Sequence, residues 1–123
     1  LNGGLTDDAQ VQEQLQRLDG VMIGRAAYYH PWWLASWDER YFGAPAQTLT
    51  RQAVEQAMVD YMLRAHAEDG APWYAIARHM LGLYHGERGA RHWRQVWSDH
   101  RLKPLDPRRV LELAHGSKQP QAA

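Results

Sequence analysis

The sequence TRQAVEQAMVDYMLRAHAEDG, residues 50–70, carries the clearest structural signal in the chain. Its apolar residues recur every three or four positions, which is the spacing of one face of an α-helix. Thr50 suits the N-cap position, where a hydroxyl accepts a hydrogen bond from a free backbone N–H. Asp69 and Gly70 suit the end of a helix. The pattern therefore predicts one long amphipathic helix between Thr50 and Gly70.

Similar apolar stripes flank this helix on both sides. They predict one helix over residues 32–42, a second over residues 73–86 and a third that begins near residue 89. A last short helix is expected through residues 110–114, bounded by Pro104 and Pro107. Glycine and proline punctuate the short connections between them. Short connections between amphipathic helices are typical of an antiparallel helical bundle.

Residues 1–29 have a different pattern, which predicts a loop, a helix, a strand, a second loop and a second helix. Thr6 is expected to cap a short helix that ends near Gly20. The apolar run at residues 21–23 lies between two glycines and predicts a short buried strand, after which Gly24 opens a strand-to-helix turn. This alternation is typical of an α/β unit. We therefore expect a mainly α chain, with a β/α remnant at residues 1–30, an antiparallel helical bundle at residues 31–115 and a disordered tail at residues 116–123.

The net charge conceals an uneven distribution. The 123 residues include 14 basic and 14 acidic ones, so the formal net charge is zero, which argues against a simple polybasic nucleic-acid binder. Residues 1–77 hold five basic and ten acidic residues, a net charge of −5, whereas residues 78–109 hold eight and three, a net charge of +5. The chain therefore has one localised basic segment.

The composition excludes several kinds of protein. The chain has no cysteine, which excludes a disulfide framework, a thiolate zinc site and a cysteine nucleophile within it. No apolar run approaches the roughly 18 residues of a membrane span, so no membrane partner is expected. The four histidines of the basic segment lack the spacing of a zinc site, and we expect no metal. They are His79, His85, His92 and His100.

Two glycine turns form the first candidate site. Asn2, Gly3 and Gly4 make one turn, Gly24 and Arg25 make the other, and both lie where a strand would end and a helix begin. Backbone N–H groups at such turns bind phosphate. In a (β/α)₈ barrel, the loops after strands 7 and 8 form a phosphate site of this kind. The alternative is a pair of ordinary glycine turns.

The helix expected from about residue 89 forms the second candidate. At about 100° per residue, Arg88, Arg91, Arg94 and Arg101 fall within an arc of about 140°. Arg91 and Arg94 are three residues apart, so their guanidinium groups would point the same way. Such groups suit phosphate oxygens and base edges. The alternative is a solvated face that is neutralised by the acidic residues of segment 1–77.

Three blocks of sequence together resemble the C-terminal part of the tRNA-dihydrouridine synthase A family. The blocks are LNGGL (1–5), LDGVMIGRAAYYHPWWLASWD (18–38) and RHMLGLYHGERGARHWRQVWSD (78–99). The resemblance extends over most of the chain, to about residue 100. It implies a TIM barrel that holds FMN, followed by a helical domain that binds tRNA. Residues 1–30 would then be the last part of the barrel.

The resemblance also implies an activity and a set of binding residues. Such a cytoplasmic enzyme uses NADPH to reduce the D-loop uridines U20 and U20a of tRNA to 5,6-dihydrouridine. The segments that bind the FMN phosphate would be matched by Asn2, Gly3, Gly4, Gly24 and Arg25. The same resemblance implies contacts with tRNA at Arg91 and Arg94, and we expect further contacts from two other cations of the basic segment, Arg78 and Lys103.

The sequence departs from the family in one important respect. The proton-donating cysteine of these enzymes has no counterpart here, so this chain is expected to hold no catalytic residue, to be inactive alone and to have at most marginal FMN affinity. A strand at residues 21–23 without its neighbours would be an unpaired edge. We therefore expect residues 1–30 to be disordered, to repack on the bundle or to associate with a second copy. The alternative function is a non-enzymatic helical module that binds an acidic protein partner.

Overall fold

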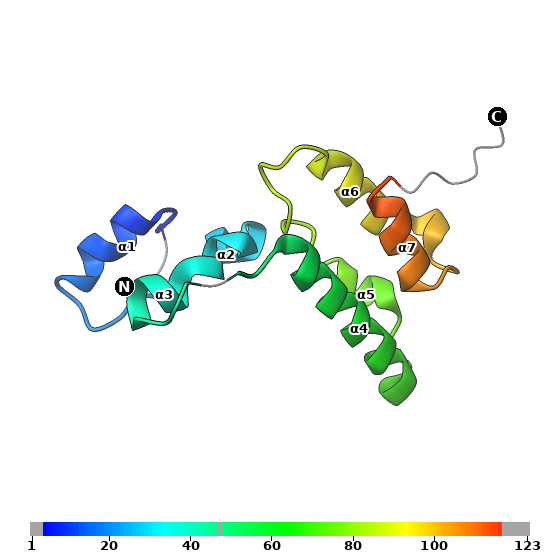
Figure 1. Cartoon of the computed structure of the whole chain (residues 1–123), viewed down its shortest axis with the longest axis horizontal. Helices are drawn as coiled ribbons and strands as arrows, with labels where there is room; N and C mark the ends of the chain where they lie inside the picture. The colour runs from blue at the N-terminus through cyan, green and yellow to red at the C-terminus, as the bar shows by residue number, and fades with distance from the viewer. Residues whose placement is uncertain (1–3, 47, 117–123) are drawn as a thin grey trace.

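The computed structural model describes residues 4–46 and 48–116, and helices dominate it (Figure 1). In chain order the elements are α1 (Asp8–Leu15), α2 (Arg25–Tyr29), the 3₁₀ helix η1 (Pro31–Ser36), α3 (Trp37–Phe42), α4 (Arg51–Asp69), α5 (Trp73–Ala77), α6 (Ala90–Trp97), the 3₁₀ helix η2 (His100–Leu102) and α7 (Pro107–Ala114). Helices α1 to α3 lie at one end of the molecule in Figure 1, and α4 to α7 lie at the other. The mainly α fold expected from the sequence is confirmed.

Helix α4 begins and ends where the sequence predicts, although Ala57 and Tyr61 of the expected apolar stripe are exposed. The Thr50 hydroxyl accepts a hydrogen bond from the Ala53 N–H at 3.0 Å, which caps the helix start. Gly70 ends the helix with a φ of +70°, in the left-handed region. Val59 and Met62 face inward and are fully buried. Both predicted ends of this helix are therefore confirmed.

The hydrophobic core lies among α4, α5, α6 and α7. Trp73 on α5, Trp93 and Trp97 on α6 and Val110 on α7 pack in one cluster with Val59 and Met62. The chain reverses between α4 and α5 through residues 70–72, and α6 packs beside α7 (Figure 1). The aromatic side chains supply much of the buried apolar surface that stabilises this small core.

The helix predicted over residues 73–86 is wrong in its length. Helix α5 ends at Ala77, and the following residues form successive turns closed by bonds such as Met80 N–H to the Ala77 carbonyl and Leu83 N–H to the Met80 carbonyl. Met80 and Tyr84 are nevertheless buried, as their spacing indicated. Apolar spacing alone did not distinguish one helix from a chain of tight turns with the same buried face.

Gly82 lies in these turns at a close contact with the α2–η1 segment. A Cβ atom at this position would stand 2.0 Å from the carbonyl oxygen of Tyr29 and 3.2 Å from Cδ of Pro31. Nearby, the Tyr28 hydroxyl lies 2.8 Å from Nδ1 of His79. Only glycine allows this approach between the two backbones. We call the contact of Gly82 with Tyr29 and Pro31 the glycine seat.

Substituting Gly82 with alanine should disturb this seat. The new methyl group would meet backbone atoms that cannot move aside as a side chain can, so we expect a loss of about 1–3 kcal/mol in the free energy of unfolding. Urea denaturation measures this loss. Gly20→Ala is the matched control, because no heavy atom lies within 4 Å of a Cβ at that position. Equal stability of the two variants would contradict the close contact between Gly82 and Tyr29.

The N-terminal segment differs from expectation at its strand and at its first cap. Within the described residues, segment 21–23 forms only an isolated bridge at Met22, whose side chain is 54% exposed, so the predicted buried strand is wrong. A strand needs paired neighbours to satisfy its backbone, and the described residues offer none beyond that bridge. The helix cap is Asp7 rather than Thr6, because the Asp7 carboxylate accepts from the Gln10 N–H at 2.9 Å.

Residues 31–42 form η1 and α3 rather than one continuous helix. Pro31 occupies the start of η1, as expected for a residue that lacks a backbone N–H. Helix α3 is held against α1, since the Tyr41 hydroxyl donates to Oδ1 of Asp8 at 2.9 Å. Burial and this bond to a carboxylate raise the pKa of Tyr41. The two helices are therefore tied by polar contacts to Asp8, from Tyr41 and from Arg40.

Candidate functional site

The two glycine turns come together in one pocket. Gly4, Gly24 and Arg25 line a cavity of about 510 Å³, with Thr6 and Tyr29 also in its wall. Asn2 and Gly3 lie outside the described residues. The two turns are about twenty residues apart in the sequence, and the fold nevertheless places them on the same cavity. This arrangement is the one that the phosphate-site interpretation requires.

The chemistry of this pocket suits an anion. Gly4 has a φ of +76°, a conformation that side-chain-bearing residues rarely adopt, and open space surrounds the Cβ positions of both Gly4 and Gly24. A ligand can therefore approach the backbone closely at these two glycines. Arg25 is exposed and forms no ion pair with any acidic residue that the structure describes. One guanidinium and open backbone donors are the groups that hold a phosphate.

Arg91 and Arg94 lie side by side on the outer face of α6. Both are exposed, whereas Trp93 and Trp97 of the same helix are buried in the core. Neither arginine has an acidic partner among the residues described. Arg88 and Arg101 lie outside α6, so the expected arc of four arginines on one helix is wrong, because the helix spans only Ala90–Trp97.

The ion pairs that the arginines of the basic segment form are local. They join Arg101 to Asp99 at 2.9 Å, Arg108 to Asp106 at 2.8 Å and Arg109 to Glu112 at 2.7 Å. Hydrogen bonds from Arg108 lower the pKa of Asp106 to about 2. The acidic residues of segment 1–77 form no ion pair with this basic segment in the described part of the chain. Among the described residues, Arg91 and Arg94 therefore form no ion pair with the acidic segment 1–77.

Arg78 and Lys103 come together at a second hollow of about 420 Å³. Tyr74, Ser98 and His100 are among the other residues that line it. The Lys103 ammonium lies 4.5 Å from the centroid of the Tyr74 ring, a distance typical of a cation–π contact. The structure therefore separates the four predicted cations into two pairs, Arg91 with Arg94 and Arg78 with Lys103.

A buried glutamate supports α6 from inside, and the sequence interpretation missed it. Glu55 of α4 is fully buried. Its Oε2 accepts hydrogen bonds from Nε1 of Trp93 at 2.7 Å and of Trp97 at 3.0 Å, and its Oε1 accepts from the Tyr84 hydroxyl at 3.0 Å. His115 also contacts Oε1. We call Glu55 with these four partners the Glu55 network.

The Glu55 network fixes the orientation of α6. Burial and the adjacent Glu55 carboxylate raise the pKa of Tyr84, so this hydroxyl stays protonated and donating. The two indole bonds determine which face of α6 turns inward, and Arg91 and Arg94 consequently face outward. A signal was present in the sequence, because Glu55 lies four residues before Val59 and seven before Met62 on the buried stripe of α4. A charged residue on such a stripe needs buried partners.

The described residues include neither a membrane-spanning helix nor a cluster of metal ligands. No helix there is long and apolar enough to span a lipid bilayer. No three histidine, aspartate or glutamate side chains in the described ranges are grouped as metal ligands. His79 contacts Tyr28, and the ring of His85 stacks against His30 with centroids 3.9 Å apart.

The chain is thus a helical segment that presents two exposed arginines on one helix and a glycine-lined, arginine-bearing pocket near its start. Residues 1–113 match the family model described as Dihydrouridine synthase (Dus). The chain therefore belongs to the dihydrouridine synthase family, and the resemblance stated from the three sequence blocks is confirmed.

Two similar proteins show how much of such an enzyme this chain represents. A tRNA-dihydrouridine(20/20a) synthase of Shewanella oneidensis is 42% identical over 119 residues, which are 97% of this chain and 35% of that protein. A protein of the same name from Pseudomonas syringae pv. tomato is 41% identical over 93% of this chain and 34% of its own length. The chain spans about a third of the length of the curated relatives that it matches.

Proposed function

We propose that this chain is part of a tRNA-dihydrouridine synthase that reduces the D-loop uridines U20 and U20a with NADPH and FMN. The family match over residues 1–113 carries the proposal. Residues 1–30 would belong to the flavin domain, residues 31–115 would form the tRNA-binding domain, and residues 116–123 would form a tail. A tRNA substrate places the enzyme in the cytoplasm.

The pocket of Gly4, Gly24 and Arg25 fits the phosphate of FMN. Its open backbone donors and its unpaired guanidinium match the charge and the acceptor oxygens of that group. Asn2 and Gly3 are proposed to complete the same site. When bound, the flavin supplies the hydride for the uridine. The residues of this chain would hold the phosphate end of the flavin and thereby fix its position.

The exposed cations of the helical segment fit the RNA backbone. Arg91 and Arg94 have no acidic partner in the described residues, so a phosphate can approach them without displacing an ion pair. Arg78 and Lys103 offer a second pair of cations. An electrophoretic mobility shift with tRNA, against a DNA duplex of similar length, tests this proposal. Equal affinity for the two would indicate nonspecific charge attraction.

The isolated chain should not catalyse the reaction. It contains no cysteine to protonate the uridine ring, so we expect no NADPH-dependent formation of dihydrouridine by the purified 123-residue chain and at most weak FMN binding. Mass spectrometry of tRNA nucleosides after incubation with FMN and NADPH measures the product. Formation of dihydrouridine above a protein-free control would contradict this prediction.

The same unpaired cations favour one alternative function. An acidic protein surface could dock on Arg91 and Arg94 in place of RNA, and the chain would then act as a non-enzymatic helical module. The exposed segment around Met22 could also associate with a second copy. Preference for tRNA over duplex DNA in the mobility shift supports the synthase proposal, and absence of tRNA binding supports the alternative. Sedimentation of the chain alone tests self-association.

A further inference from the structure

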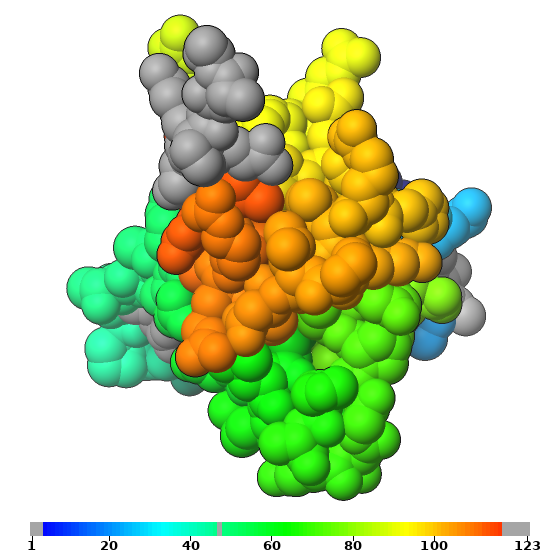
Figure 2. Space-filling model, turned by 90° about the vertical axis from the view of Figure 1, so that its right-hand side faces the viewer, coloured from blue at the N-terminus to red at the C-terminus, as the bar shows by residue number. Residues whose placement is uncertain are grey.

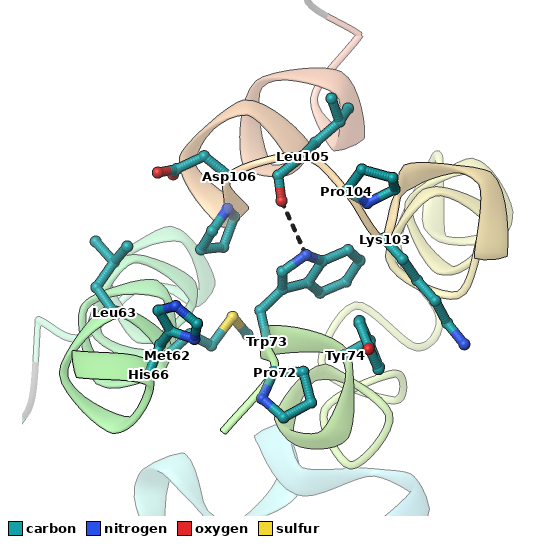
Figure 3. A pocket seen from close by; sticks show the side chains of 11 residues that line it. Met62, Leu63, His66, Pro72, Trp73, Tyr74, Lys103, Pro104, Leu105 and Asp106 are labelled. Carbon is teal, nitrogen blue, oxygen red and sulfur yellow. Dashed lines mark hydrogen bonds between the residues drawn. The ribbon is translucent and has the colours of Figure 1, made fainter. Parts of the chain in front are cut away.

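The hollow that contains Arg78 and Lys103 has the size and shape of a ligand site. It lies where the start of α5, the end of α6 and the η2 turn meet, and its volume of about 420 Å³ is within the usual range for small ligands, roughly 300–1,000 Å³. Tyr74 and Lys103 form one side of it and also line a neighbouring pocket of about 480 Å³. That pocket is drawn in Figure 3, where Tyr74 lies between Trp73 and the Lys103 side chain.

Tyr74 offers an aromatic surface on a rigid support. Behind it, the buried Trp73 donates a hydrogen bond from Nε1 to the Leu105 carbonyl at 3.0 Å (Figure 3). The Tyr74 and Trp73 rings meet edge to face with centroids 5.6 Å apart, which holds Tyr74 in place. Tyr74 is nevertheless 36% exposed. The Lys103 ammonium lies on this ring, and a base that replaced it there would leave the ammonium free for a phosphate.

The charge of the hollow is cationic. Arg78 and Lys103 form no ion pair in the described part of the chain, and Nε of Arg78 donates a hydrogen bond to Nε2 of His79 at 3.2 Å. Asp99 is the acidic residue in the lining, and Arg101 binds both of its carboxylate oxygens, at 3.1 and 2.9 Å. An approaching phosphate therefore meets two available cations and a carboxylate that is already paired.

The hollow lies at the end of α6, on the same helical face as Arg91 and Arg94. Ser98, which lines the hollow, follows Arg94 by four residues and Arg91 by seven, and its hydroxyl donates to the Arg94 carbonyl at 2.6 Å. Residues at these spacings lie on one helical face, and seven residues of α-helix span about 10 Å. A nucleic-acid strand that follows Arg91 and Arg94 thus arrives at Tyr74.

We infer that this hollow binds one unstacked nucleotide of the RNA, with its base against Tyr74 and its phosphate between Arg78 and Lys103. Aromatic side chains beside cations are the usual platform for single-stranded bases. The inference rests on the proposed function and adds to it a place where the RNA is held through a base rather than through its backbone alone.

The test compares tyrosine variants in tRNA binding by the 123-residue chain. Tyr74→Leu removes the stacking surface, and we expect the Kd to rise about tenfold with an unchanged salt dependence. Tyr74→Phe keeps the surface and should bind as the unaltered chain does. Tyr61→Leu is the matched control, because Tyr61 is also exposed beside an arginine, with Arg64 5.9 Å from its ring, but lines neither pocket.

A charge variant separates stacking from electrostatics. Lys103→Ala should lower the slope of log K against log salt by about 0.7–0.9, as expected for the loss of one phosphate contact. Equal tRNA affinity of Tyr74→Leu and Tyr61→Leu would overturn the nucleotide site. If the Arg91→Ala, Arg94→Ala variant is meanwhile impaired, the proposed function stands and only this inference fails. A chain that binds no tRNA overturns both.

Discussion

Replacing Glu55 with alanine is expected to lower the free energy of unfolding by about 3–5 kcal/mol. The substitution leaves the indole N–H groups of Trp93 and Trp97 and the hydroxyl of Tyr84 without their acceptor inside the core. Each buried donor that loses its partner costs about 1–3 kcal/mol. The lost side chain also leaves a cavity. Urea denaturation followed by tryptophan fluorescence measures the change.

Two further variants show whether hydrogen bonding causes this loss. Glu55→Gln keeps the shape, since its amide oxygen can accept from the two indoles while its NH₂ group donates to the oxygen of Tyr84. We expect a much smaller loss for it, about 1 kcal/mol. Glu68→Ala removes an exposed glutamate from the same helix and should be nearly neutral. A loss for Glu55→Gln as large as that for Glu55→Ala would show that the negative charge itself is required.

The double substitution of Arg91 and Arg94 with alanine should weaken tRNA binding at least tenfold. Each arginine that contacts a phosphate releases counterions on binding, so the slope of log K against log salt should fall by about 1.4–1.8 when both contacts are lost. Both side chains lie on the exposed face of α6, and the core beneath them is unaltered. Fluorescence anisotropy of labelled tRNA at four or more salt concentrations measures affinity and slope together.

The matched control removes the same formal charge from paired positions. Arg108 and Arg109 are bound by Asp106 and Glu112, two and three residues away, so their loss should reduce tRNA affinity much less. If Arg108→Ala, Arg109→Ala weakens binding as much as the α6 variant does, total charge rather than the α6 surface determines affinity, and the proposed role of Arg91 and Arg94 is wrong.

Local signals in the sequence predicted the elements that depend on local physics. The ends of α4 follow from Thr50 and Gly70, and the start of α6 follows from Gly89, because caps act through neighbouring backbone groups. The sequence also identified the residues of the glycine-lined pocket and the outward arginines of α6. Their binding roles stay predictions.

Features that depend on distant residues were not predicted. The early end of α5 accompanies the contact of Gly82 with Tyr29. Tyr29 lies 53 residues earlier in the chain, so the spacing of apolar residues around Gly82 could not indicate this contact. The strand expected at residues 21–23 had the right composition, but strands form only with partners. The hollow at Tyr74 was not predicted, because Arg78 and Lys103 lie at the ends of different elements and line the same cavity only in the folded chain.

The partners of Glu55 all come from far along the chain. They follow it by 29, 38, 42 and 60 residues, and the last of them, His115, lies just beyond α7. Contacts so distant close only after the intervening segments have come together. During synthesis, Glu55 can therefore contact His115 only after the end of α7 has left the ribosome. The core is completed from its C-terminal end, and a nascent chain that stops short of residue 115 lacks one of the contacts at its centre.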